Sequence, residues 1–198
     1  MKALFSLLLV IAPLHFETGR FTIYQDGKKI GTEEFTITPV STGYLVEGHT
    51  VIKDSSQDVD LKSKMALDAN LKTKSYEFQS KGSSIKMTVG LPTSEIVTTV
   101  EGETRSDDFR FPEDGFIVDA NFFHHYAILL YRIRAAVATD SVSAFVPQEL
   151  ELGQLRVKNV GNNTYEMDPG NLKVIATTDK DGRLIRLTVP EAKVVVER

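Results

Sequence analysis

The stretch "VDLKSKMAL", residues 59–67, alternates apolar and polar side chains with a period of two. Successive side chains of a β-strand point to opposite faces, so this period predicts a strand with one buried and one solvated face. The apolar side consists of Val59, Leu61, Met65 and Leu67, and the other side of Asp60, Lys62, Lys64 and Ala66. Such a strand is typical of an antiparallel sheet with one face on the core.

The same alternation continues in both directions along the chain. It recurs in "EFTIT" (34–38), "SSIKMTVGL" (83–91) and "SVSAFV" (141–146), and reversals are marked by Asp26-Gly27 and Asp181-Gly182. The pattern gives about a dozen strands, and open sheets curl or split at about ten. We therefore predict a mostly β protein, an antiparallel meander curved into a barrel or half-barrel.

One segment breaks the alternation. "NFFHHYAILLYRIRAA", residues 121–136, has no glycine or proline, and its spacing i, i+3, i+7, i+10 predicts one apolar helical face. That face consists of Phe123, Tyr126, Leu130 and Ile133. Asp119 or Asn121 is placed to cap the start of the helix, and Arg132 and Arg134 lie near its end, where cations are favoured. We expect one helix across or beside the concave face of the sheet.

Composition excludes several classes of protein. The 198 residues suit one domain, and no linker or internal repeat divides them. The absence of cysteine excludes disulfides, thiolate metal sites, a cysteine nucleophile and a lipid-modified N-terminal cysteine. A net charge of −4 gives no basic footprint for nucleic acid. No phosphate-binding glycine loop is present, so no cofactor is expected.

The N-terminus resembles a secretory signal. Lys2 is followed by an apolar run from Ala3 to Leu14, which is too short to span a bilayer. We expect a signal segment over residues 1–19, a single β-rich domain over 20–198, a periplasmic or secreted location and no transmembrane span. The alternative is that the apolar run is a buried first strand of a cytosolic protein.

The adjacent histidines lack the spacing of a metal site. On a helix His124 and His125 point about 100° apart, whereas zinc usually takes histidines at i and i+4. We predict that they bind no metal, with one ring packed at the helix flank and the other in water. Asp58 and Asp60 share a strand face and are the only carboxylate pair that we weigh for a hydrolase, although solvated edge charges are the commoner use.

No serine nucleophile motif occurs, so catalysis is not expected. Five lysines are predicted on the outer face of neighbouring strands: Lys62, Lys64, Lys72, Lys74 and Lys86. A lipid headgroup or other polyanion would suit them. Because Glu47, Asp60 and Glu77 are interleaved, an ordinary solvated face is the favoured interpretation.

Three segments resemble exported bacterial β-rich proteins classed as domains of unknown function. They are "FTIYQDGKKIGTEEFTI" (21–37), "LLYRIR" (129–134) and "TTDKDGRLIRLTVP" (177–190). The shared motifs are a G-x-x-x-G turn, a helical Y-x-x-R at Tyr131 and Arg134, and a D-x-x-G-R-L hairpin at Asp179, Gly182, Arg183 and Leu184. The layout is also similar to the half-barrels of lipoprotein carriers. The resemblance implies an architecture and a location, and it brings no catalytic residue.

The sequence favours an exported, non-catalytic binding module. In this interpretation the helix closes the concave face over a lipid-like or other apolar ligand. The residues expected to line the site are Phe122, Phe123, Tyr126, Leu130 and Ile133. The alternative is an envelope scaffold or protein-interaction domain, with an envelope protein as partner and only a core inside the concavity. The third possibility is a hydrolase around Asp58 and Asp60 or around the histidine pair.

Overall fold

The computed structural model describes residues 16–53, 58–119, 121–135, 141–168 and 172–198. Most of the expected signal segment, residues 1–15, lies outside the described residues, as does Ala136 at the end of the expected helix.

The described residues form fifteen strands, one α-helix and one 3-10 helix. The N-terminal strands are β1 (Glu17–Gln25), β2 (Lys28–Val40), β3 (Gly43–Lys53), β4 (Asp58–Asp68), β5 (Thr73–Ser80), β6 (Ser83–Thr88), β7 (Ser94–Val100), β8 (Glu103–Phe109) and β9 (Phe116–Ile117). Then follow α1 (His124–Ala135), β10 (Ser141–Val146), β11 (Glu151–Gly161), β12 (Thr164–Asp168), β13 (Val174–Thr178), β14 (Leu184–Val189), η1 (Pro190–Ala192) and β15 (Val194–Glu197).

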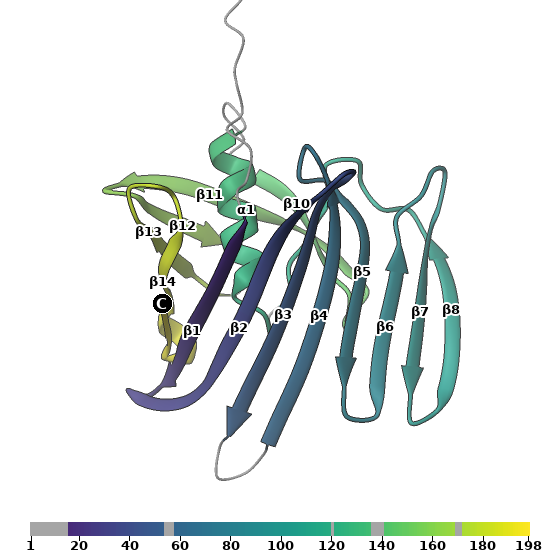
Figure 1. Ribbon diagram of the computed structural model, residues 1–198, viewed down its shortest axis with the longest axis horizontal. Helices are drawn as coiled ribbons and strands as arrows, with labels where there is room; N and C mark the ends of the chain where they lie inside the picture. The colour runs from purple at the N-terminus through teal and green to yellow at the C-terminus, as the bar shows by residue number, and fades with distance from the viewer. Residues whose placement is uncertain (1–15, 54–57, 120, 136–140, 169–171) are drawn as a thin grey trace, which may run out of the picture.

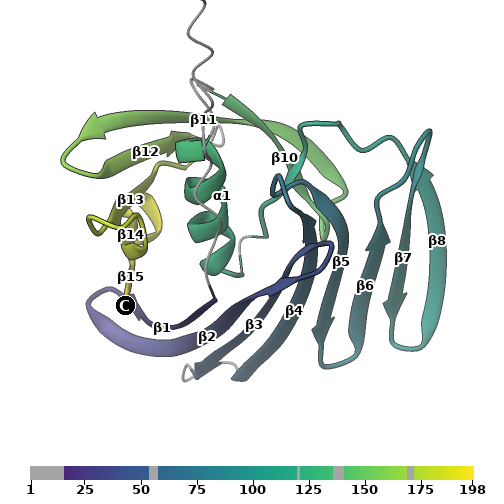
Figure 2. The ribbon, with the colours of Figure 1, turned by 45° about the horizontal axis from the view of Figure 1, so that its top comes forward.

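All the strands belong to one curved sheet that wraps around α1 (Figures 1 and 2). The spatial order is β8-β7-β6-β5-β4-β3-β2-β1-β15-β14-β13-β12-β11-β10-β9. Neighbours pair antiparallel except β9 and β10, which are parallel. β1 pairs with β15 and so joins two meanders, while β8 and β9 are the edge strands of the sheet. The predicted curved, mostly β meander with one helix is confirmed.

Aromatic side chains connect the two ends of this open sheet. Phe109, at the end of β8, stacks on Phe145 of β10 with ring centroids 5.0 Å apart. Phe111 meets both rings edge-on. Apolar packing therefore brings the two ends together where strand hydrogen bonding does not.

The period-two pattern gives the two faces of the sheet. In β4, Leu61, Met65 and Leu67 are buried, whereas Lys62 and Lys64 are exposed, as the alternation predicts. The turn residues also behave as expected. Asp26 and Gly27 have φ values of 49° and 75°, the conformation of a two-residue hairpin whose twist matches that of the flanking strands.

The helix starts three residues later than predicted and is more deeply buried. It starts at His124, and its first two turns are buried on every side, including Ile128 and Leu129, which lie off the predicted apolar face. From Tyr131 onward the described helix residues reach solvent: Tyr131, Arg132 and Ile133 are partly buried and Arg134 is exposed. A helix enclosed by a sheet has no solvated face to keep polar, which explains why one stripe at helical spacing did not describe it.

The end of α1 is held by residues from both ends of the chain. The Tyr131 hydroxyl donates to Glu17 Oε2 of β1 over 2.7 Å, and Arg198 Nη1 donates to Glu17 Oε1 over 2.7 Å. Burial, followed by the hydrogen bond to Glu17, raises the pKa of Tyr131. Arg134 fills the space beside Gly182, where a Cβ would clash with its guanidinium. The Y-x-x-R and D-x-x-G-R-L motifs therefore meet in space.

Glu17, Thr18 and Gly19 belong to β1, although the sequence interpretation placed them in the signal segment 1–19. They pair with Ile37, Thr36 and Phe35 of β2. Among the described residues, the first strand therefore begins at Glu17. No helix among the described residues is long and apolar enough to cross a membrane.

Candidate functional site

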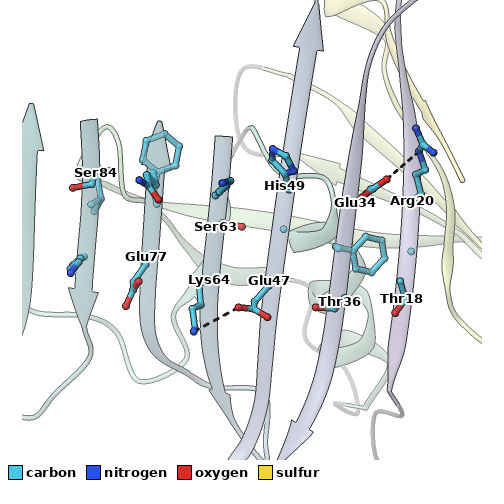
Figure 3. A pocket seen from close by; sticks show the side chains of 18 residues that line it. Thr18, Arg20, Glu34, Thr36, Glu47, His49, Ser63, Lys64, Glu77 and Ser84 are labelled. Atoms are coloured by element: carbon cyan, nitrogen blue, oxygen red, sulfur yellow. Dashed lines mark ion pairs between the residues drawn. The ribbon is translucent and has the colours of Figure 1, made fainter. Parts of the chain in front are cut away.

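A trough crosses the outer face of the sheet over β1 to β6 (Figure 3). Its floor is a row of residues paired in register from strand to strand, whose side chains, where they have one, lie on the inner face. This row is Gly19, Phe35, Gly48, Ser63, Phe78 and Ile85. The trough has a volume of about 1040 Å³.

Two rows of outward-facing side chains form the walls. One row is Arg20, Glu34, His49, Lys62, Gln79 and Ser84, and the other is Thr18, Thr36, Glu47, Lys64, Glu77 and Lys86. The two rows are two residues apart along each strand, or about 7 Å, and six strands span about 24 Å. The trough is therefore long and narrow, with its axis across the strands.

The walls are polar and carry charges of both signs. Arg20 pairs with Glu34 across 3.7 Å, and Lys64 with Glu47 across 3.7 Å. With histidine neutral, the walls carry four cations against three carboxylates, a charge of +1, on a chain whose net charge is −4. The trough therefore offers hydrogen bonds and paired charges rather than apolar contact.

The lysines expected on one outer face are divided by the structure. Lys62, Lys64 and Lys86 line the trough, while Lys72 pairs with Glu113 and Lys74 with Asp68. Glu47 and Glu77 are interleaved with them as predicted. Asp60 pairs with His49 of the trough wall over 2.9 Å and is exposed, as is Asp58, so no enclosed carboxylate site forms there.

Below the trough floor, on the inner face, lies a buried polar cluster around Glu33. Glu33 Oε1 accepts from the His124 backbone N–H at 2.8 Å, and Oε2 accepts from the Phe123 N–H at 2.8 Å. The Thr50 hydroxyl donates to Oε2 over 2.9 Å, and His124 Nδ1 lies 3.1 Å from Oε1. A carboxylate from β2 thus caps the N-terminus of α1, where the helix dipole favours negative charge.

The His124 ring sits against the sheet because Gly48 leaves room for it. A Cβ at residue 48 would clash with His124 Cε1. The imidazole stacks on Phe35 at 5.7 Å between centroids, and its Nε2 lies 3.4 Å from Ser63 Oγ. Phe35, Gly48 and Ser63 are register neighbours, so one row of the sheet shapes both this socket and the trough floor.

A second buried carboxylate, Asp119, organises the segment before the helix. It accepts from the Tyr76 hydroxyl at 2.5 Å and from the Gln148 amide, and its Oδ1 accepts from the Asn121 N–H at 2.9 Å. Burial, followed by the nearby Asp119 charge, raises the pKa of Tyr76. The Asp119 N–H donates to His125 Nδ1 over 3.1 Å, so His125 carries its proton on Nε2.

Both histidines are fully buried, so the prediction that one of them meets water is wrong. Burial, and then the neighbouring His124, lowers the pKa of His125, whose Nε2 has no hydrogen-bond partner among the described residues. The sheet curves around the helix and encloses both histidine rings. The periodicity of a short stretch of sequence does not show which distant strands will cover a side chain. Across the described ranges, no three His, Asp or Glu side chains form a metal-binding group.

Ser63, His124 and Glu33 stand in the order of nucleophile, base and orienting acid. All three side chains are buried, however, and the Glu33 oxygens are occupied by the helix N–H groups and Thr50. A hydrolase must bring a substrate carbonyl to within about 3 Å of the nucleophile. Here the serine hydroxyl faces the core, so the arrangement supports a structural role.

The five residues expected to line a ligand site under the helix belong to the core cluster or pack against it. Phe122 and Leu130 have no exposed surface, and Tyr126 is 9% exposed. Phe123 and Ile133 are partly buried against the same cluster. Phe122 packs edge-on against Phe78 of β5. These side chains therefore form part of the core or pack against it.

The sequence interpretation missed Glu33 and Ser63. A signal for Glu33 was present, because in "EEFTI" the alternation places residue 33 on the same face as Phe35 and Ile37. A carboxylate on an apolar face needs buried partners. Nothing in the local sequence identifies those partners, since Glu33 and His124 are 91 residues apart.

Comparisons with known proteins give a likeness of fold. No protein-family model matches the sequence, and no curated protein matches it. Among solved structures, the crystal structure of a DUF1089 family protein from Pseudomonas aeruginosa is similar, with a TM-score of 0.51 and 13% identity. The match covers 81% of this chain and 90% of that one. At this identity the similarity shows a shared β-rich fold.

Proposed function

We propose that this protein is a non-catalytic interaction domain that binds an extended, polar polypeptide segment in the trough across β1 to β6. The observation that carries the proposal is the pair of polar side-chain rows that continue in register over six strands. A length of about 24 Å accommodates about seven residues of extended chain at about 3.3 Å each.

The chemistry of the walls favours a peptide over other elongated ligands. Cations and carboxylates along the rows, with Ser84 at the end of one row and Thr18 and Thr36 at the end of the other, offer partners for charged side chains and for backbone amides. An acyl chain needs apolar walls, and neutral sugars are usually bound against exposed aromatic rings. The two aromatic residues at the trough, Phe35 and Phe78, are buried with their side chains on the inner face.

A lipid-like or other apolar ligand between α1 and the sheet is supported less. It would have to displace Phe122 and Leu130, which already fill the space between the helix and the strands. Each fully buried apolar side chain of this size contributes about 1.5 to 3 kcal/mol to the stability of the fold, and a ligand that displaced it would have to replace that contribution. Hydrolysis is likewise disfavoured, because Ser63 Oγ faces the core.

We also propose that the domain is exported and meets its partner in the envelope or outside the cell. The support for this is the N-terminal lysine followed by the apolar run from Ala3 to Leu14, the pattern of a secretory signal. A polar trough on the outer face suits a partner encountered in water.

A displayed library of random heptapeptides, selected on the purified protein, tests the proposed function. Thr36→Trp and Gln79→Trp fill the trough from its two walls. Lys158→Trp, at an exposed position of β11 outside the trough, is the matched control. Selected peptides should bind wild type and the control alike and lose about tenfold or more in affinity to either trough variant, a difference of about 1.4 kcal/mol.

Two results would contradict the proposal. One is a library that yields no binder to wild type. The other is a set of binders that tolerate both trough variants, which would place the contact elsewhere. Acidic and neutral oligosaccharides serve as competitors, and displacement of the peptides by these sugars would assign the trough to glycans instead.

A further inference from the structure

The edge strand β8 has free backbone groups at regular positions. The two-residue turn Glu101-Gly102, with φ values of 51° and 88°, makes Val100 and Glu103 a hydrogen-bonded pair. Hydrogen-bonded and open pairs alternate in an antiparallel ladder. Arg105 and Asp107 therefore direct their N–H and C=O groups toward β7.

The intervening residues Thr104, Ser106 and Asp108 direct their backbone N–H and C=O groups away from the sheet. β8 is the last strand of the sheet, and no described element lies beyond it in either view (Figures 1 and 2). Such an edge is a template for pairing with another strand.

We propose that β8 is a self-association edge, at which two copies of this chain pair antiparallel about a twofold axis through Ser106. In this register Ser106 faces Ser106 of the second copy, and Thr104 faces Asp108. The outward N–H and C=O groups of all three residues then find partners. Arg105 of each copy lies opposite Asp107 of the other, in open pairs where side chains approach most closely.

Charge selects this register over its neighbours. A twofold axis through Arg105 would set two guanidinium groups opposite each other, and an axis through Asp107 would oppose two carboxylates. Like charges directly opposite one another destabilise a ladder. An axis through Thr104 or Asp108 would carry part of each β8 beyond the end of its partner. The axis at Ser106 alone combines full overlap with opposite charges.

The ion pair within the strand fits the same arrangement. Arg105 Nε lies 2.7 Å from Asp107 Oδ2 of its own chain, and the arginine side chain is 76% exposed. Two such pairs side by side across the axis form an alternating square of charges. A C2 contact of this kind is self-complementary, so association stops at a dimer.

Cysteine cross-linking tests the register, because the chain has no native cysteine. Ser106→Cys places two thiols across the axis, where Cα atoms of a ladder pair are about 5.5 Å apart and a disulfide can form. Thr104→Cys is the matched control on the same face, and its two copies would lie about 14 Å apart in this register. Mild oxidation should give a covalent dimer with Ser106→Cys and little with Thr104→Cys.

Charge exchange tests the contact without cysteine. Sedimentation equilibrium over a concentration series should show a dimer for wild type and at least about a tenfold weaker one for Arg105→Asp, which opposes two carboxylates. The exchange Arg105→Asp with Asp107→Arg should restore the dimer. A wild-type protein that stays monomeric, efficient cross-linking through residue 104, or an Arg105→Asp dimer of unchanged strength would each overturn the proposal.

Discussion

Glu33 and His124 are joined twice, through the backbone N–H of the histidine at 2.8 Å and through its ring Nδ1 at 3.1 Å, both to Oε1. The carboxylate is fully buried and comes from the strand next to β3, whose Gly48 makes room for the ring. One side chain therefore fixes both the start of the helix and its depth inside the sheet.

Glu33→Gln should lower the free energy of unfolding by about 2 to 4 kcal/mol. The amide nitrogen is a donor and cannot accept from the helix N–H groups, so buried donors lose their partner, at about 1 to 3 kcal/mol each. Glu34→Gln is the matched control, because its side chain is exposed and pairs loosely with Arg20; it should change stability by less than about 0.5 kcal/mol. Urea titration of both proteins measures the difference, and equal losses would contradict the assigned cap.

His125 should make stability fall in mild acid. Burial lowers the pKa of His125 below its ordinary value near 6.5, so the unfolded chain takes up a proton there before the folded chain does. The neutral His125 ring makes its full contribution to the free energy of unfolding above about pH 6.5. That contribution is lost as the pH falls toward the folded-state pKa, by at most about 1.4 kcal/mol per pH unit.

The variant His125→Phe isolates this effect. It removes the titrating group and the acceptor for the Asp119 N–H, so its stability at neutral pH is lower. Its stability should nevertheless decline less steeply than that of wild type between about pH 6.5 and 5. Urea titrations at a series of pH values give both slopes, and identical slopes would show that His125 does not stay neutral in the folded protein.

Leu130→Ala should lower the free energy of unfolding by about 2 to 5 kcal/mol, the range for truncation of a fully buried leucine. The same variant separates the two functions considered for the helix. If α1 covered a ligand, native mass spectrometry of wild type would detect a bound lipid that Leu130→Ala loses, while most of the stability remained. A large loss of stability with no lipid in wild type is the result we expect.

N-terminal sequencing of protein from the native cell should find a mature start between Pro13 and Glu17. The lower limit follows from the end of the apolar run, and the upper limit from the pairing of Glu17 with Ile37 and its bond to Tyr131. Removal of Glu17 would leave the Tyr131 hydroxyl without its hydrogen-bond acceptor. An intact Met1 in a soluble cell extract would refute the export proposal.

The local sequence determined the strands, the turns and the position of the helix. Alternation in "VDLKSKMAL" placed Leu61 and Met65 inside and Lys62 and Lys64 outside, because the pleat repeats every two residues. Asp26-Gly27 determined a hairpin, since both residues adopt positive φ there. These features depend on neighbours in the chain, and a window of a few residues contains the information.

Only the tertiary structure decided what the helix touches and where the outer face is hollowed. Burial of His124 depends on strand residues that are 61 and 91 residues away in sequence. The trough depends on the register of six strands and the bend of the sheet. Register and curvature are collective properties, fixed when distant strands pack around one core. For that reason the stripe of apolar residues on the helix did not by itself reveal its contacts, and in the structure these residues belong to the core cluster or pack against it.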